Sequence, residues 1–197
     1  HKEYRRQRQM CIRDRAWTDQ LTDLGRILQP ALQALADKFL PHLEVAHREL
    51  TAGTEKLRVT YQPDAQIPPA GGGRDALWSR ERERGLNLAG PQRDDWDFSL
   101  GGRSLSRFGS EGQRRSACLA VRLAELQLIR EIRKRTPILL VDDALKELDE
   151  NRRMAFWRLV PPGVQVLYAS AHDRPDTGGD SWVILQISPG AAHPFAA

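Results

Sequence analysis

Apolar residues recur every three or four positions from residue 16 to residue 47, which is the spacing of one face of a helix. Pro30 and Pro41 interrupt this stretch, so we expect two or three linked helices that kink or break at the prolines. In residues 55–63 apolar and polar positions instead alternate, which predicts a half-exposed strand. Residues 64–76 are rich in turn-forming residues and predict a linker. The glycine run in this linker is not a phosphate loop, because no Lys-Ser or Lys-Thr pair follows it.

The next stretch, residues 80–113, predicts the end of a second helix, a Gly-Pro turn and a hairpin. Apolar residues alternate with polar ones up to Leu100, and a Gly-Gly pair then supplies the turn. We expect Leu105 and Phe108 to lie on the returning strand.

The remaining pattern predicts helices and strands in alternation. The expected elements are a long amphipathic helix from Ser110 to Pro137, a buried strand at 138–143, a short helix at about 150–159 with Asp149 as its N-cap, and buried strands at 164–170 and 181–187. Parallel strands need crossover connections of this kind. We therefore predict an α/β fold with a mostly parallel sheet.

The composition fits one or two globular domains, because 40% of the 197 residues are hydrophobic and 28% are charged. No apolar run approaches the ~18 residues of a membrane span, and no secretory leader opens the chain. Cys11 and Cys118 are too few for a disulfide framework and lack the partners of a zinc site. We expect a cytoplasmic protein with no membrane association.

The net charge of +4 does not come from the body of the chain. Six of the 30 Lys and Arg residues and two of the 26 Asp and Glu residues lie in residues 1–15, so the remainder carries 24 of each. A basic arm for phosphates is one interpretation of this leader. The stretch "QRQMCIRDR" instead resembles translated sequencing-adapter read-through. We therefore expect residues 1–15 to be non-native, the natural chain to begin near Ala16, and the protein to be a fragment.

The helix after Ser110 begins with more small and polar residues than a helix start requires. Ser110 and Gln113 have the spacing of a capping box, which accounts for both of them. Gly112 is not accounted for, because glycine in a helix costs roughly 1 kcal/mol relative to alanine. A helix N-terminus without a side chain at this position is a surface that a phosphate can approach closely.

Asp142 and Asp143 end the expected buried strand, at the sheet edge where functional groups gather in α/β folds. An isolated pair of this kind is most often a solvated turn. In combination with the helix start at Ser110, the pair favours a phosphate chemistry. One carboxylate would hold Mg²⁺ through its water shell, and the other would orient a water for attack on a γ-phosphate.

Four motifs carry a family resemblance. "GPQRDD", "FGSEGQRRS", "LLVDDALKELD" and "VQVLYAS" occur in this order and at spacings that closely resemble the C-terminal half of the RecF family. These are bacterial DNA replication and repair ATPases of the ABC type, related to SMC proteins. The resemblance covers about residues 16–187. It implies the C-terminal part of an ABC-type ATPase head with a helical arm of a second lobe.

The resemblance implies a division of the chain into four parts. These are a non-native leader at 1–15, the helical arm and hairpin of the second lobe at 16–107, a C-terminal ATPase subdomain at 108–190, and a tail at 191–197.

The resemblance also implies site residues. Ser110, Gly112 and Gln113 would form the signature motif, which contacts the γ-phosphate of ATP held by the opposite subunit. Asp142 would be the Walker B aspartate that binds Mg²⁺, and Asp143 would position the attacking water.

Two further positions follow from the same resemblance. Residues 147–149 look like the D-loop that crosses the dimer interface, which assigns Asp149 to the nucleotide site. His172 stands where a switch histidine sits in many ABC ATPases, although a surface histidine in a loop is the alternative. Three positions depart from the family pattern and receive no role: Gln92, Arg114 and Lys146.

The chain contains no G-x-x-x-x-G-K-[ST] phosphate loop, so it carries half of an ATP site. The resemblance implies an ATPase in the full-length homodimer, which closes on DNA when ATP binds and opens on hydrolysis. It also implies RecO and RecR partners at gaps and junctions between duplex and single-stranded DNA. From the chain alone we expect little or no ATP hydrolysis. Candidate phosphate contacts, which are more simply explained as a solvated face, are Arg74, Arg80, Arg82, Arg84 and Arg93.

Two alternatives stay open at this point. One is another SMC-like ABC ATPase head, although such a head would be expected to insert a long coiled coil. The other is a non-hydrolysing DNA-binding adaptor module in which the ATPase motifs are relics.

Overall fold

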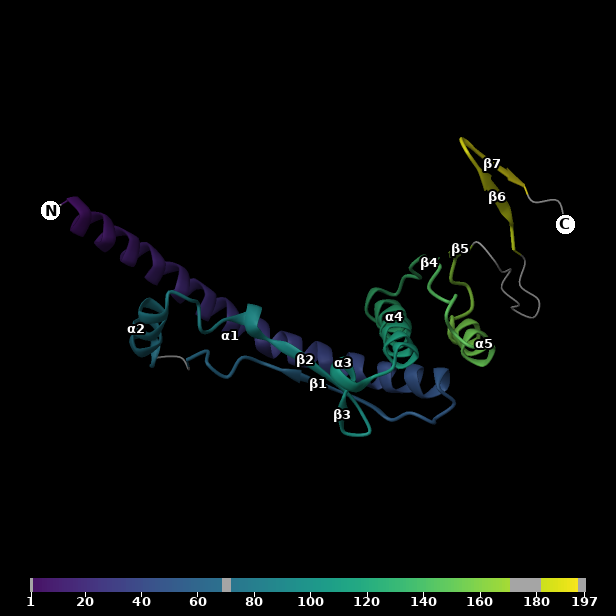
Figure 1. Ribbon diagram of the computed structural model, residues 1–197, viewed down its shortest axis with the longest axis horizontal. Coiled ribbons are helices and arrows are strands. Elements are labelled where there is room, and N and C mark those ends of the chain that lie inside the picture. The colour runs from purple at the N-terminus through teal and green to yellow at the C-terminus, as the bar shows by residue number, and fades with distance from the viewer. Residues whose placement is uncertain (1, 69–71, 171–181, 195–197) are drawn as a thin grey trace. The chain divides into compact units, whose positions relative to one another are not determined.

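The computed structural model describes residues 2–68, 72–170 and 182–194. The chain divides into two compact units, residues 1–137 and 138–197. The elements of the first unit are α1 (Lys2–Leu50), β1 (Leu57–Gln62), α2 (Arg74–Arg84), the 3₁₀ helix η1 (Pro91–Arg93), β2 (Asp95–Leu100), β3 (Arg103–Ser104), α3 (Leu105–Phe108) and α4 (Glu111–Arg133) (Figure 1).

α1 is one continuous helix, so of the kinks or breaks predicted at the prolines, the breaks are wrong. Pro30 and Pro41 lie inside the helix, and both are exposed. An interior proline costs about 3 kcal/mol, in part because it leaves one helix carbonyl without its N–H donor. At exposed positions water can bond to that carbonyl, and packing of α1 against β1, α2 and α4 offsets the remaining cost.

β1, β2 and β3 form an antiparallel sheet that lies along α1 (Figure 1). The side chains of β1 alternate as predicted, with Tyr61 buried and Thr60 exposed. Gly101 and Gly102 both have positive φ, 55° and 82°, as the tight turn between β2 and β3 requires. The predicted returning strand is wrong beyond Ser104, because α3 begins at Leu105.

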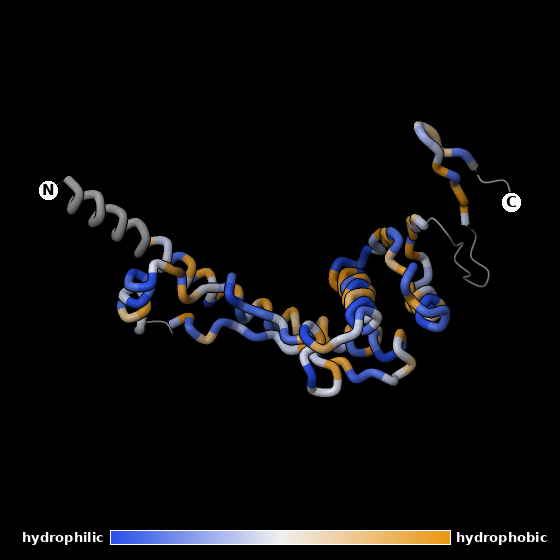
Figure 2. The backbone as a smooth tube through the Cα atoms, viewed as in Figure 1, coloured by the Kyte–Doolittle hydropathy of each residue, from blue (hydrophilic) through white to orange (hydrophobic). Residues whose placement is uncertain are grey.

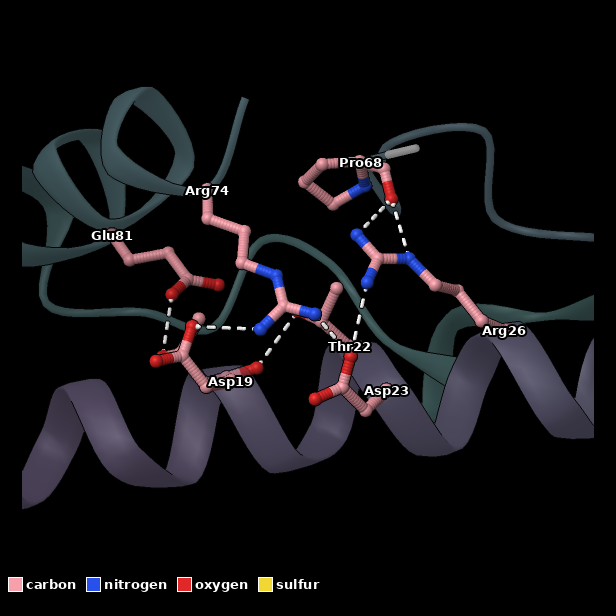
Figure 3. A network of polar contacts seen from close by, with 8 residues as sticks. Asp19, Thr22, Asp23, Arg26, Pro68, Arg74 and Glu81 are labelled. Carbon is pink, nitrogen blue, oxygen red and sulfur yellow. Dashed lines mark hydrogen bonds and ion pairs between the residues drawn. The ribbon is translucent and has the colours of Figure 1, made fainter. Parts of the chain in front are cut away.

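Glu81 anchors α2 to α1 by a buried hydrogen-bond network (Figure 3). Its carboxylate accepts a hydrogen bond from the Thr18 hydroxyl at 2.9 Å and another from the Leu88 N–H at 2.7 Å. Beside this network, Gly25 allows a close approach, because a Cβ there would lie 2.4 Å from Ile67 Cδ1. The glycine in the middle of α1 is therefore explained by packing.

α4 packs against α1, and His42 on α1 lies 3.2 Å from the Glu131 carboxylate on α4. α4 belongs to the first compact unit for this reason. The two compact units divide at residues 137 and 138. The division into a second-lobe part and an ATPase subdomain at residues 107 and 108 stays a prediction.

The second unit contains β4 (Leu139–Asp142), α5 (Glu150–Leu159), β5 (Val166–Ala169), β6 (Leu185–Ser188) and β7 (Ala191–Pro194). β4 and β5 pair in parallel, as predicted. Val141 on β4 is buried, but Leu140 and Leu167 are 70% and 55% exposed. The expectation that these strands are buried on both faces is therefore wrong for the described residues, in which one face is open.

The expectation that residues 181–187 form a further buried strand is also wrong. β6 pairs antiparallel with β7, and Leu185 and Ile187 are exposed on it. In Figure 2 apolar and polar colours alternate along this strand. Pro189 and Gly190, with φ of 82° at the glycine, form the tight turn between the two strands. The predicted tail at 191–197 thus begins with a strand.

No helix among the described residues is long and apolar enough to cross a bilayer.

Candidate functional site

The N-terminus of α4 is closed by a complete capping box, as the sequence predicts. The Gln113 N–H donates to the Ser110 hydroxyl at 3.2 Å, and the Ser110 N–H donates to the Gln113 side-chain oxygen at 2.9 Å. Ser110 is exposed. Its hydroxyl therefore lies at the surface while it caps the helix.

The two glycines beside this cap have different structural roles. A Cβ on Gly109 would lie 2.5 Å from the Leu105 carbonyl oxygen, so packing requires glycine there. A Cβ on Gly112 would meet no atom within 4 Å, and Gly112 does not have positive φ. Among the described residues, neither packing against another element nor backbone conformation therefore requires glycine at position 112.

Asp142 and Asp143 lie at the C-terminal end of β4, as predicted, and both are exposed. Asp142 is the last residue of the strand and pairs with Ala169 on β5. Asp143 has φ of 46°, in the left-handed region that few non-glycine residues adopt. A hydrogen bond of 3.1 Å from its N–H to the Ala169 carbonyl oxygen holds this conformation.

The turn after Asp143 leads directly into α5. Leu145 and Leu148 are buried beneath it, and Asp149 is the N-cap of α5, as predicted. The Asp149 carboxylate accepts a hydrogen bond from the Arg152 N–H at 3.0 Å. His172 lies outside the described residues.

Asp142 and Asp143 supply carboxylate oxygens, which Mg²⁺ prefers. No cluster of three or more His, Cys, Asp or Glu residues occurs in the described part of the chain. Mg²⁺ in nucleotide sites is commonly held by one or two carboxylates together with water and substrate phosphates.

Asp94 joins several elements of the first unit. Its carboxylate accepts hydrogen bonds from the Tyr61 hydroxyl at 2.5 Å, the Asp64 N–H at 2.8 Å and the Gln29 amide at 2.9 Å. Although burial opposes it, these bonds hold the pKa of Asp94 below its usual value. Burial, followed by the bond to Asp94, raises the pKa of Tyr61 to about 12. Asp94, within "GPQRDD", therefore has a structural role. The feature of the sequence that indicates this role is an acidic residue next to a strand that contains aromatic residues.

Arg74 and Arg82, which are among the candidate phosphate contacts, have interaction partners within the chain. Arg74 forms ion pairs with Asp19, at 3.6 Å, and with Asp23 (Figure 3). The Arg82 guanidinium lies 4.7 Å from the centre of the Trp78 ring. The partners of Arg74 are carboxylates of the chain itself, which favours a structural role for this residue over a phosphate contact.

Several curated proteins are similar to the chain, and all of those below are DNA replication and repair proteins named RecF. The relative from Limosilactobacillus fermentum is 35% identical over 75% of the chain and 42% of its own length. The relative from Picosynechococcus is 32% identical over 91% of the chain and 49% of its own length. The relative from Crocosphaera subtropica is 30% identical over 80% of the chain and 44% of its own length. The chain thus spans about half the length of these relatives.

Two solved structures share the fold. One is a structure of the recombination mediator protein RecF-ATP in the RecFOR pathway, with a TM-score of 0.69 and 22% identity over 90% of the chain and 50% of that protein. The other is the corresponding RecF-ATPrS structure, with a TM-score of 0.65 and 24% identity over 95% of the chain and 50% of that protein. The predicted α/β fold is confirmed. No protein-family model matches the chain.

Proposed function

Because the chain belongs to the RecF family, corresponding to the C-terminal part of its members, we propose that it serves as half of an ATP-dependent mediator of DNA replication, repair and recombination. In this proposal the N-terminus of α4 receives the γ-phosphate of ATP bound by the opposite subunit. ATP then closes a homodimer on DNA.

The empty space at Gly112 carries the proposal. Apart from the neighbouring residues and the backbone of α4 itself, the described part of the chain places no atom within 4 Å of a Cβ built at Gly112, and alanine would favour the helix. A phosphate that approaches the first turn of α4 supplies a reason for the missing side chain, since backbone N–H groups and the helix dipole there favour an anion. The exposed Ser110 hydroxyl adds a donor at the same place, and Gln113 orients it through the capping box.

The strand-end carboxylates complete the proposed chemistry. Asp142 would hold Mg²⁺, which supplies charge neutralisation at the phosphates when bound. Asp143 would accept a hydrogen bond from the attacking water and so orient it. The left-handed backbone of Asp143 supports this role, since strained conformations cluster at functional sites. Asp149, in the D-loop that crosses the dimer interface, and His172, as a switch histidine, would contact the nucleotide.

The same proposal includes the cellular partners. The protein would act in the cytoplasm at gaps and junctions between single-stranded and double-stranded DNA, together with RecO and RecR. These assignments rest on the family and not on a contact in this chain.

A full-length protein that carries this chain as its C-terminal half tests the proposal. We expect Ser110→Arg to block ATP-dependent dimerisation, because the long cationic side chain would fill the place of the incoming phosphate. Nucleotide binding to the subunit's own phosphate loop should persist. Sedimentation velocity with and without ATP measures the dimer, and a fluorescent nucleotide measures binding. Dimers of the variant in ATP would refute the role of this helix start.

A further inference from the structure

Basic residues gather at the C-terminal end of α4. Four of the six residues at positions 130–135 are cations: Arg130, Arg133, Lys134 and Arg135. The last three are exposed, and Arg130 is partly exposed. Within the described ranges, no carboxylate forms an ion pair with any of the four. Their charges are therefore not neutralised by the chain itself.

A hollow of about 410 Å³ lies at this end of the helix, and its lining is polar throughout. The lining residues are Gln127, Arg130, Glu131, Lys134, Arg135 and Thr136. Glu131 is the one carboxylate among these six residues, and it lies 3.2 Å from His42 on α1. The exposed apolar residues of this part of α4, Ile129 and Ile132, do not belong to the lining. The hollow thus presents three cations against one carboxylate.

The helix dipole explains only part of this cluster. It favours cations in the last turn of a helix, which accounts for Arg130 and Arg133. Lys134 is the C-cap, and its φ of 51° lies in the left-handed region, where glycine is preferred. Among the described residues its ammonium group has no hydrogen-bond or ion-pair partner, so it does not bond to the carbonyls at the end of α4. A lysine at this position favours a partner for the cation outside the chain.

The chemistry of the lining favours the backbone of double-stranded DNA over other anions. Exposed cations hold a single phosphate weakly, because water and salt screen each ion pair, whereas a polyanion gains from several contacts at once. Protein interfaces bury apolar or aromatic side chains at their centre, and single-stranded nucleic acid is commonly held by aromatic stacking. The lining has neither kind of side chain. Arg, Lys, Gln and Thr are instead side chains that contact DNA phosphates and sugars.

We propose that the C-terminal end of α4, residues 127–136, binds the sugar-phosphate backbone of double-stranded DNA. Arg130, Lys134 and Arg135 contact phosphates at the hollow, and Arg133 contacts one beside it. Backbone contacts carry no base information, so binding is independent of DNA sequence. α4 has 23 residues, which places this surface about 34 Å from the helix start proposed to receive ATP. The inference rests on the proposed function, to which it adds the residues that contact DNA.

Fluorescence anisotropy of a fluorescein-labelled duplex measures binding to the chain. We expect Lys134→Gly combined with Arg135→Gln to weaken binding at least tenfold at about 100 mM salt. The slope of log Kd against log salt concentration should fall by about 2, because each phosphate contact contributes about 0.9. Glycine relieves the left-handed backbone at position 134, so urea denaturation should show no loss of stability from that substitution.

The matched control is Arg58→Gln combined with Arg103→Gln. Both arginines are exposed on the sheet of the same unit, and neither lines the hollow. This variant removes the same net charge, so affinity and salt slope should stay nearly unchanged. Equal losses in the two double variants would reduce the effect to net charge and overturn the proposal. Absence of duplex binding would overturn it as well, as would a poly-glutamate peptide that binds more tightly than the duplex and is equally weakened by the substitutions at 134 and 135.

A full-length protein that carries this chain separates the proposal from the proposed function. The substitutions at 134 and 135 should leave ATP-dependent dimerisation intact in sedimentation velocity, while the duplex binds at least tenfold more weakly. If the protein dimerises in ATP and binds the duplex equally well with and without these substitutions, the role of the α4 end is refuted and the proposed function stands. A full-length protein that neither dimerises in ATP nor binds DNA would refute the proposed function itself.

Discussion

Replacing Gly112 by alanine separates the folding role of the α4 start from its proposed role at a phosphate. The new methyl group would meet no atom within 4 Å, and the backbone conformation at Gly112 is open to alanine. Alanine is favoured over glycine in a helix by about 0.5–1 kcal/mol. We therefore expect Gly112→Ala to raise the free energy of unfolding by about this amount.

The effect on assembly should have the opposite sign. The methyl group would stand where the phosphate of the opposite subunit approaches the first turn of α4. We expect ATP-dependent dimerisation to weaken at least tenfold, which corresponds to about 1.4 kcal/mol. A variant that is more stable but assembles less well cannot be explained by damage to the fold.

Two measurements are needed. Urea denaturation followed by circular dichroism gives the free energy of unfolding of this chain. Sedimentation velocity with ATP gives dimerisation of a full-length protein that carries it. Gly72→Ala is the matched control, since Gly72 also has no atom within 4 Å of a Cβ and lies outside the proposed site. Undiminished dimerisation of Gly112→Ala would refute the phosphate explanation, and a loss of stability would refute the structural one.

Three further outcomes follow from the same geometry. Asp143→Asn should slow ATP hydrolysis of the full-length protein about 100-fold or more while dimers still form in ATP. Asparagine accepts the left-handed backbone, but its uncharged amide is a weaker hydrogen-bond acceptor for the attacking water than the carboxylate. Unchanged turnover would remove Asp143 from its role. Asp149→Ala should lower the free energy of unfolding by about 1 kcal/mol through loss of the α5 cap, and Asp149→Ser, which keeps a capping oxygen, should restore most of it in urea denaturation. The raised pKa of Tyr61 means that the folded state disfavours ionisation of its hydroxyl. The resulting contribution to the free energy of unfolding is complete below pH 10 and is lost between pH 10 and about 12. Tyr61→Phe should remove that decline from a pH series of denaturation curves.

The features that the sequence predicted correctly depend on neighbours along the chain. The capping box of Ser110 and Gln113 needs an interval of three residues, and the cap of Asp149 needs the same interval. The parallel pairing of β4 with β5 follows from the short helix between them. These signals are local, because each depends on residues a few positions apart or on a single crossover connection.

The features that the sequence predicted wrongly depend on what each segment packs against or pairs with, which the periodicity of its apolar residues does not specify. Pro30 and Pro41 weaken a helix locally, but packing along α1 keeps it continuous. The apolar run in β6 indicated a buried strand, but periodicity cannot identify the partner of a strand, and a Pro-Gly turn pairs β6 with β7 instead.

Gly112 belongs to neither class, and this makes it informative. A residue explained by local propensity would be alanine, and a residue explained by packing would have a neighbour, as Gly25 has Ile67 and Gly109 has Leu105. Gly112 disfavours its helix, and a Cβ there would meet no atom of another described element within 4 Å. We propose that the reason for this glycine is a group that approaches from outside the chain, and at the positive end of a helix dipole that group would be an anion. The composite ATP site proposed for the dimer would supply such an anion, and the position would then be explained by the assembled protein rather than by the single chain.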